Sequence, residues 1–274
     1  MDITIAEINS CAEYLRNSGF EKPIVGIVLG TGLGSLINNI KIITTKVYAD
    51  IPGFPVATVE FHKGQLIYGM IDDTPVIVMQ GRFHYYEGYS MQQITFPVRV
   101  MKELGVKYLL LSNAAGGMNP AYKKGDLVLL DDHINNLPEN PLRGLNDPAF
   151  GNRFVDMCKP YSEFLNEKII FAAGKMNIKI DKGVYVAVMG PNLETRAEYR
   201  YLRLSGADMV GMSTVPEVIV ANHISLPCAA ISVITDECDP DNLQPVNISE
   251  IIKVAGEADQ VLTTLITAVI KELV

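Results

Sequence analysis

Apolar runs of strand length alternate along this chain with longer stretches of helical periodicity, and this alternation limits the possible fold more than any other feature. Strands that are apolar along their whole length are buried on both faces, which is typical of parallel sheets covered by helices. We therefore predict an α/β fold with a largely parallel sheet. The apolar runs occupy 24–30, 65–70, 76–80, 108–112, 126–131, 184–189, 207–211 and 228–235, and the helical stretches occupy 92–104, 161–176, 194–205, 216–225 and 249–273.

A further helix is predicted at the start of the chain, where Thr4 and Glu7 have capping-box spacing and Gly19 ends the apolar periodicity. The 274 residues are 48% hydrophobic and 20% charged, which is a globular composition. No repeat or linker-like composition shift divides them, so we predict one domain over residues 1–274. The segment 135–153 shows neither helical nor strand periodicity, and a loop of this length is typical of a lid, a binding loop or an interface element.

The charge of the chain argues against a nucleic-acid partner. Its formal net charge is −8 and it has no run rich in Lys and Arg, whereas proteins that bind phosphate backbones need basic stripes. The negative net charge is still compatible with binding of a small anion, because one Arg and a few backbone amides are enough to hold it.

The sequence also favours a cytoplasmic location. The chain begins without a basic segment followed by an apolar one, so no signal peptide is predicted. The apolar stretch 218–235 is interrupted by polar residues and a proline, which indicates a core segment and not a membrane span. The cysteines lack CxxC spacing, and we expect them to be reduced thiols: Cys11, Cys158, Cys228 and Cys238.

Two segments of small residues follow predicted strands. The segment GTGLGS (30–35) allows an anion to approach the backbone, but Ser35 takes the last glycine position of GxGxxG, so neither a nicotinamide nor a nucleoside triphosphate is supported. An ordinary tight turn explains these residues equally well. The segment SNAAGGMNP (112–120) exposes backbone N–H groups, although close packing of a helix on the sheet explains it slightly better.

The segment GRFHYYEGY (81–89) gathers groups that can bind an anion. Arg82 offers a planar set of donors suited to phosphate oxygens, and His84 can hold a proton near neutral pH. Both follow a predicted strand, and the carboxyl edge of a sheet is where α/β folds bind ligands. A purely structural histidine is an equally good interpretation of the residues alone.

Further polar residues follow the later strands, each with a simpler alternative. Glu194 precedes a predicted helix, where a carboxylate often only complements the helix dipole, and Ser213 has the position of a helix cap. Asp236 begins an acidic loop of the kind that is usually solvated. No histidine or cysteine spacing fits zinc and no GxSxG is present, so we predict neither a metal nor an acyl nucleophile.

Taken together, the motifs resemble those of the trimeric purine nucleoside phosphorylases, in order and in approximate spacing, from about residue 25 to residue 235. The segments are GTGLGSL, GRFHYYEGY, SNAAGGMNP, DHINN, NPLRGLND, GPNLETRAEYR and GMSTVPEVIVANH. The resemblance implies a nucleoside phosphorylase fold, with a mixed central sheet or distorted barrel flanked by helices. It implies phosphorolysis of purine ribonucleosides and 2′-deoxyribonucleosides to the base and the sugar 1-phosphate by a homotrimer. Inorganic phosphate would be a co-substrate, and no cofactor is implied.

The resemblance also assigns roles to residues. It implies His84, Glu194 and Asp236 as catalytic residues, His62 as a mobile gate near phosphate, and Phe154 as a contact to a neighbouring subunit's site. Phosphate would be held by Thr31, Arg82, His84, Ser213 and the backbone N–H of Ala114; the ribose would meet Tyr86, Met212 and Ile248; and the base would meet Tyr185, Leu193, Glu194 and Asp236.

Two positions depart from the inosine- and guanosine-specific pattern. Asp236 stands where those relatives carry Asn and methylthioadenosine phosphorylases carry Asp, and Ile248 stands where many relatives carry a ribose-binding His. Glu194 and GMSTVPE match the inosine and guanosine pattern, which we therefore favour. The alternatives are a methylthioadenosine or adenosine phosphorylase and, less well supported, a binding protein without turnover. Because two carboxyls flank the base, we expect Asp236 to be the protonated one and Glu194 to be ionised.

Overall fold

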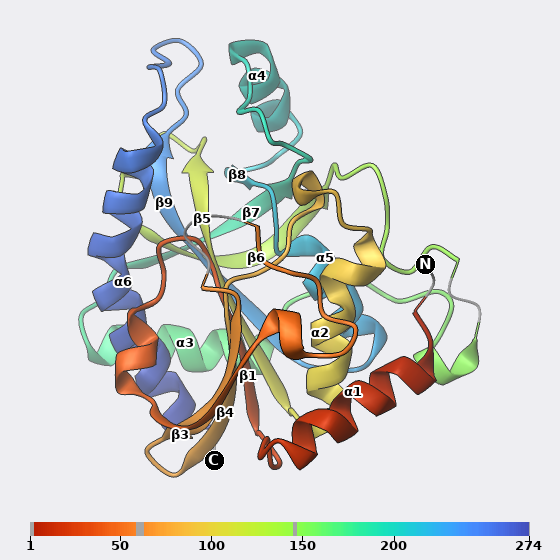
Figure 1. Cartoon of the computed structure of the whole chain (residues 1–274). Coiled ribbons are helices and arrows are strands. Elements are labelled where there is room, and N and C mark those ends of the chain that lie inside the picture. Colours follow the sequence, from red (N-terminus) through yellow and green to blue (C-terminus); the bar gives the residue numbers. More distant parts are fainter. Residues whose placement is uncertain (1–2, 59–62, 145–146, 274) are drawn as a thin grey trace.

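The computed structural model describes residues 3–58, 63–144 and 147–273 and contains one mixed sheet with helices on both sides (Figure 1). The strand order is β2-β3-β4-β1-β5-β8-β7-β6-β9, and β9 pairs back onto β5. The ring β5-β8-β7-β6-β9 is therefore closed like a small barrel. The strands are β1 (Val25–Leu29), β2 (Lys41–Val47), β3 (Gln65–Ile71), β4 (Thr74–Gln80), β5 (Tyr108–Gly117), β6 (Leu127–Asn135), β7 (Ile180–Ala187), β8 (Met209–Gly211) and β9 (Cys228–Glu237).

The largely parallel sheet predicted from the apolar runs is only partly correct. β1 runs parallel to β4 and β5, and β5 runs parallel to β9, but β2–β3, β3–β4, β5–β8 and β6–β9 are antiparallel. A strand buried on both faces looks equally apolar in either direction, so the sequence pattern does not report orientation. The mixed sheet with a distorted barrel, which the family resemblance implied, is confirmed.

The helices divide between two faces of the sheet. Figure 1 shows α6 on one side and α1, α2 and α5 on the other, and the buried side chains form a separate core on each side. No helix in the described parts of the chain is long and apolar enough to cross a membrane. The helices are α1 (Ile5–Asn17), α2 (Met91–Leu104), α3 (Glu163–Lys175), α4 (Arg196–Leu204), α5 (Val215–His223) and α6 (Ile248–Lys271).

The local signals agree with most of these elements. Thr4 and Glu7 form the predicted capping box of α1, and Thr195 and Glu198 form another at α4. One prediction needs correction. The segment SNAAGG does not follow its strand but continues β5 to Gly117, where it pairs with β9. GTGLGS does follow β1, and it leads into a short 3-10 helix, η1 (Ser35–Asn39).

Strand β2 was not predicted. Its residues are mostly exposed and it lies at the edge of the sheet, so it lacks the continuous apolar run that marks the buried strands. In the middle of the sheet, parallel pairing brings the carboxyl ends of β4, β1 and β5, and of β9 beside β5, to the same side of the molecule. This edge is where the predicted site residues converge.

Candidate active site

A cavity of about 270 Å³ lies at this edge of the sheet, and most of the predicted residues line it. A larger cleft of about 490 Å³ between α1, α2 and η4 (Pro148–Phe150) contains none of them. The smaller cavity is therefore the candidate active site. Of the predicted residues, it is lined by Thr31, Arg82, His84, Tyr86, Ala114, Leu193, Glu194, Met212, Ser213, Asp236 and Ile248.

The strand ends approach each other very closely at one end of the cavity. A Cβ on Gly30 would lie 2.7 Å from Asn113 Cα and 2.8 Å from the Ser112 carbonyl oxygen. Only glycine fits at this position, since both neighbours are backbone atoms that a side chain cannot push aside. Gly30 thus allows a close approach of β1 to its parallel neighbour β5, and the nearby residues Thr31 and Ala114 line the cavity.

Arg82 is held in place by other buried groups. Its Nε donates to Glu217 Oε1 over 3.0 Å and its Nη1 donates to the Ser112 carbonyl oxygen over 2.5 Å, while the residue is only 1% exposed. A buried, oriented guanidinium keeps its charge and directs it at a fixed point. Glu217 was not predicted as part of the site, because in the sequence it is simply an acidic residue at the start of a predicted helix.

His84 is fixed by Glu87, which was not assigned a role either. The His84 Nδ1 hydrogen bonds Glu87 Oε1 over 2.9 Å, and the backbone N–H of His84 donates to the same oxygen over 2.8 Å. Burial alone would raise the pKa of Glu87, but hydrogen bonds from His84 and Thr58 outweigh it and lower the pKa to about 2. Glu87 is therefore an ionised acceptor, and it orients the imidazole.

The pKa of His84 itself is lowered. Burial is the main cause and the charge of Arg82 adds to it, while the hydrogen bond to Glu87 opposes both. The ring also stacks on Tyr86, with centroids 4.6 Å apart and planes 16° from parallel. An anion placed beside His84 would favour its protonated form, so proton uptake and anion binding are coupled at this residue.

Ser213 is positioned by a buried hydrogen-bond network. Ser232 Oγ donates to Asn113 Oδ1 over 2.7 Å, and Asn113 Nδ2 donates to Thr214 Oγ1 over 2.9 Å. Thr214 has φ +68°, which is strained for a β-branched residue, and its hydroxyl lies 3.1 Å from Ser213 Oγ. The network holds Thr214 in this conformation and so turns Ser213 toward the cavity. No sequence signal indicated Thr214.

The opposite end of the cavity holds two carboxyls. Thr235 Oγ1 donates to Asp236 Oδ1 over 2.8 Å, and the Cys238 thiol donates to Asp236 Oδ2 over 3.1 Å. Burial raises the pKa of Glu194, and Asp236 contributes to the rise despite an opposing hydrogen bond from Tyr199. The sequence-based expectation placed the proton on Asp236 and the charge on Glu194. In this arrangement Asp236 accepts hydrogen bonds at both oxygens, and Glu194 is the carboxyl with the raised pKa.

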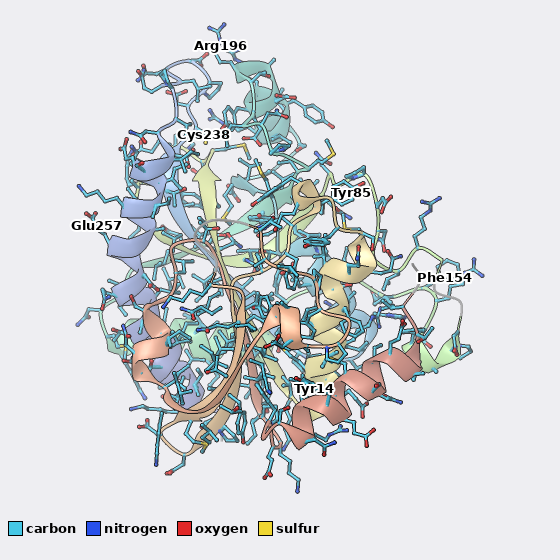
Figure 2. The ribbon with its side chains drawn as sticks, in the orientation of Figure 1. Tyr14, Tyr85, Phe154, Arg196, Cys238 and Glu257 are labelled. Carbon is cyan, nitrogen blue, oxygen red and sulfur yellow. The ribbon has the colours of Figure 1, made fainter. Side chains whose placement is uncertain are left out.

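Three predicted residues do not line the cavity. Tyr185 is fully buried beneath it, and its hydroxyl accepts a hydrogen bond from the Ser213 backbone over 3.3 Å. It supports Ser213, and the structure does not bring it to the space where a base would lie. Phe154 is 87% exposed and lies at the periphery of the molecule, away from Cys238 at the edge of the sheet that carries the cavity (Figure 2). His62 lies outside the residues that the structure describes.

Comparisons with known proteins show which family this chain and its fold are similar to. The Phosphorylase superfamily matches residues 24–271. Purine nucleoside phosphorylase 1 of Geobacillus stearothermophilus is 45% identical over 266 residues, which cover 97% of each chain. A Schistosoma mansoni purine nucleoside phosphorylase solved with adenosine is 37% identical, with a TM-score of 0.92 over 99% of this chain and 98% of that one. A schistosome purine nucleoside phosphorylase solved with hypoxanthine has 38% identity, the same TM-score and full coverage of both chains.

The chain therefore belongs to the phosphorylase superfamily, and within it to the family of purine nucleoside phosphorylases. It is an enzyme of that family, as its motifs implied.

Proposed function

We propose that this enzyme cleaves purine ribonucleosides and 2′-deoxyribonucleosides with inorganic phosphate, giving the free base and the sugar 1-phosphate. The observation that carries the proposal is one cavity with anion-binding groups at one end and two carboxyls at the other. Arg82, His84 and Ser213 can hold phosphate oxygens, and Glu194 and Asp236 can hydrogen bond a purine. Tyr86 and Met212 also line the cavity, and we assign them to the ribose.

The chemistry needs no covalent enzyme intermediate. A phosphate oxygen forms a bond to C1′ as the bond from C1′ to the purine nitrogen breaks, and the electron pair of that bond moves to the purine. Phosphate stabilises the positive charge that develops on the ribose, and donors around the purine stabilise the negative charge on the leaving base. Positioning and preorganised electrostatics supply the rate acceleration. Inorganic phosphate is the co-substrate, and we propose no further cofactor.

Inosine and guanosine are the substrates we favour, and a specific observation supports 6-aminopurine nucleosides as a second class. Both oxygens of Asp236 accept hydrogen bonds from Thr235 and Cys238, so this carboxyl is arranged to accept from an exocyclic amino group as well. Ile248 lines the cavity without a polar group that would need a 5′-hydroxyl as its partner. The schistosome relatives were solved with adenosine and with hypoxanthine, which is consistent with a family site that admits both.

We also propose the assembly and location of the enzyme. One domain over residues 1–274 forms a homotrimer, in which the exposed Phe154 completes the site of a neighbouring subunit and His62 gates access to phosphate. The four cysteines are free thiols, which fits a reducing cytoplasmic environment.

The experiment that tests the function measures base release from inosine, guanosine, adenosine and methylthioadenosine, with and without phosphate. We expect phosphate-dependent release from inosine and guanosine, and slower release from adenosine. Asp236→Asn should lower the rate with adenosine relative to inosine, because the amide NH₂ cannot accept from the amino group. Absence of phosphate-dependent release from all four nucleosides would refute the proposed function.

A further inference from the structure

A buried acid on α6 contacts the segment that carries Thr31. Asp259 is only 3% exposed, and its Oδ2 accepts a hydrogen bond from the backbone N–H of Ser35 over 2.6 Å. Ser35 is the first residue of η1 and directly follows the segment 30–34. Figure 1 shows η1, in orange-red, beside α6. Asp259 therefore holds the end of the connection between β1 and η1.

The position of Asp259 on its helix is unusual for an acid. The buried face of α6 is otherwise almost entirely apolar from Ala255 to Ile270. The salt bridges of the described residues do not include Asp259, and its Oδ1 accepts only from Thr263 Oγ1, over 3.4 Å. Burying a carboxyl costs free energy unless its oxygens accept hydrogen bonds. An apolar residue would avoid that cost at this position, but it could not hold the N–H of Ser35.

Two further contacts join the same segment to α6. Gln260 Nε2 donates to Ser35 Oγ over 3.0 Å. Gly32 has φ +76°, and a Cβ on it would lie 2.9 Å from Ala255 Cβ, so the backbone of the segment passes directly over the helix. Ala255, Asp259 and Gln260 lie within two turns of α6. Together they hold both the middle and the end of the segment 30–35.

The start of the segment is held by the sheet, and Thr31 lies between the two attachments. The N–H of Leu33 donates to the Gly30 carbonyl oxygen over 3.1 Å, which closes a β-turn with Thr31 at its second position and Gly32 at its third. Thr31 lines the cavity, whereas Asp259 and Gln260 do not. The place of Thr31 in the cavity therefore depends on contacts that α6 makes outside it.

From these contacts we infer that Asp259 is a positioning residue for the phosphate site. It holds the segment 30–35 against α6, so that Thr31 stays in the cavity, where we assign it to phosphate. Asp259 itself lies outside the cavity and acts through Thr31. The inference rests on the proposed function and concerns how the phosphate site of that function is built.

The test compares the KM for inorganic phosphate with the KM for inosine in variants of the whole enzyme. Asp259→Ala should raise the phosphate KM about tenfold, because a hydrogen-bond donor to a charged ligand is misplaced. It should leave the inosine KM nearly unchanged. General damage to α6 would raise the inosine KM as well, because the same helix lines the cavity with Ile248, Ile251 and Ile252. The two KM values thus separate positioning from structural damage.

Two other substitutions at the same position complete the test. Asp259→Asn keeps an oxygen that can accept from the N–H of Ser35, so it should restore most of the phosphate KM. Asp259→Leu fits the apolar face of α6 and should give the same result as Asp259→Ala, including in the event that the alanine variant does not fold. A folded leucine or alanine variant with the wild-type phosphate KM would overturn the role of Asp259.

Matched variants of neighbouring residues test the path of the effect. Thr263→Val removes the other hydrogen bond of Asp259 and keeps the contact to Ser35, so the phosphate KM should not change. Gln260→Ala alters an exposed residue and should raise the phosphate KM about twofold. In a Thr31→Ala background, Asp259→Ala should have little further effect on the phosphate KM. Equal effects of Thr263→Val and Asp259→Ala, or full additivity with Thr31→Ala, would contradict the inference.

Two measurements do not require turnover and separate the inference from the proposed function. Amide hydrogen exchange in the segment 31–35 should be faster in Asp259→Ala than in the wild type. Calorimetric binding of inorganic phosphate should weaken by the same factor by which the phosphate KM rises. Unchanged exchange and unchanged phosphate binding would overturn the role of Asp259. A wild-type enzyme that binds phosphate through Asp259 in this way but releases no base would overturn the proposed function alone.

Discussion

At the scale of single residues, the anion end of the cavity depends on two side chains that buried acids hold in place, one acid near in the sequence and one far away. Arg82 bonds Glu217 of α5 and a β5 carbonyl oxygen, and His84 bonds Glu87, which is itself held by Thr58. Each side chain that would face phosphate is thus backed by a carboxylate. This arrangement fixes direction and protonation, and its removal has consequences for stability as well as for binding.

Replacing Arg82 should weaken phosphate binding by about 1.5–3 kcal/mol, or roughly tenfold to a hundredfold in the phosphate KM, because a charge-assisted donor is lost. Arg82→Ala also leaves Glu217 as an unpaired buried charge, which is strongly destabilising. The double variant Arg82→Gln, Glu217→Gln removes both charges and separates the two effects. If this folded variant keeps the wild-type phosphate KM, the assignment of Arg82 is wrong.

Glu87 should make the enzyme sensitive to acid. Its pKa in the folded protein is about 2, below the usual 4.5, so its ionisation stabilises the fold above pH 4.5, and this contribution is lost as the pH falls from 4.5 toward 2. Glu87→Gln should lower the free energy of unfolding at pH 7 by about 2 kcal/mol. Urea unfolding at pH 7 and pH 3 should show a smaller difference between variant and wild type at pH 3. An equal difference at both pH values would contradict this role.

At the scale of elements, the cap of α4 fixes the start of the helix that follows Glu194, a residue that lines the cavity. Thr195 caps α4 by accepting from the Glu198 backbone N–H, and Glu198 accepts from the Thr195 N–H over 2.7 Å. Glu194 immediately precedes this cap, so the start of α4 determines where its carboxyl lies. The same motif at Thr4 caps α1, which does not line the cavity.

Thr195→Ala should cost about 1 kcal/mol of stability, the usual effect of losing a helix cap, and should raise the KM for nucleoside more than the KM for phosphate. Thr4→Ala is the matched control: it should cost a similar amount of stability and leave both KM values unchanged. Thermal unfolding and steady-state kinetics measure the two effects. Equal kinetic effects from the two variants would show that the cap of α4 has no special role in the site.

At the scale of the whole molecule, Phe154 is a large aromatic residue that the core of its own chain does not bury. It is 87% exposed and follows the long loop 135–153, which the sequence suggested as a lid, a binding loop or an interface element. An exposed aromatic side chain of this size is available for contact with a second protein chain. A neighbouring subunit is the partner we propose.

Phe154→Ala should leave the thermal stability of the isolated subunit nearly unchanged, since the side chain buries little surface within its own chain. It should raise the nucleoside KM about tenfold, the effect of about 1.4 kcal/mol of lost contact in the neighbouring site. Analytical ultracentrifugation across a dilution series, with activity measured on the same samples, tests the assembly. A fully active monomer would disprove it.

The sequence by itself determined which segments become buried strands and helices, where α1 begins, and which motifs supply the side chains of the cavity. These features depend on apolar periodicity, capping and glycine, which act over a few residues. Arg82, His84, Glu194, Ser213 and Asp236 stood out as polar residues after predicted strands, the family resemblance assigned their roles, and the structure brings them to one cavity.

Only the tertiary structure decided the mixed strand directions, the closure of β9 onto β5, the strained backbone of Thr214 and the place of Tyr185 beneath the site. It also decided that Asp236 accepts hydrogen bonds from Thr235 and Cys238 and that Glu217 and Glu87 hold Arg82 and His84. The physical reason is the same in each case. Strand pairing, desolvation and hydrogen bonding between distant segments depend on which groups come into contact in the folded chain. A local pattern of residues does not contain that information.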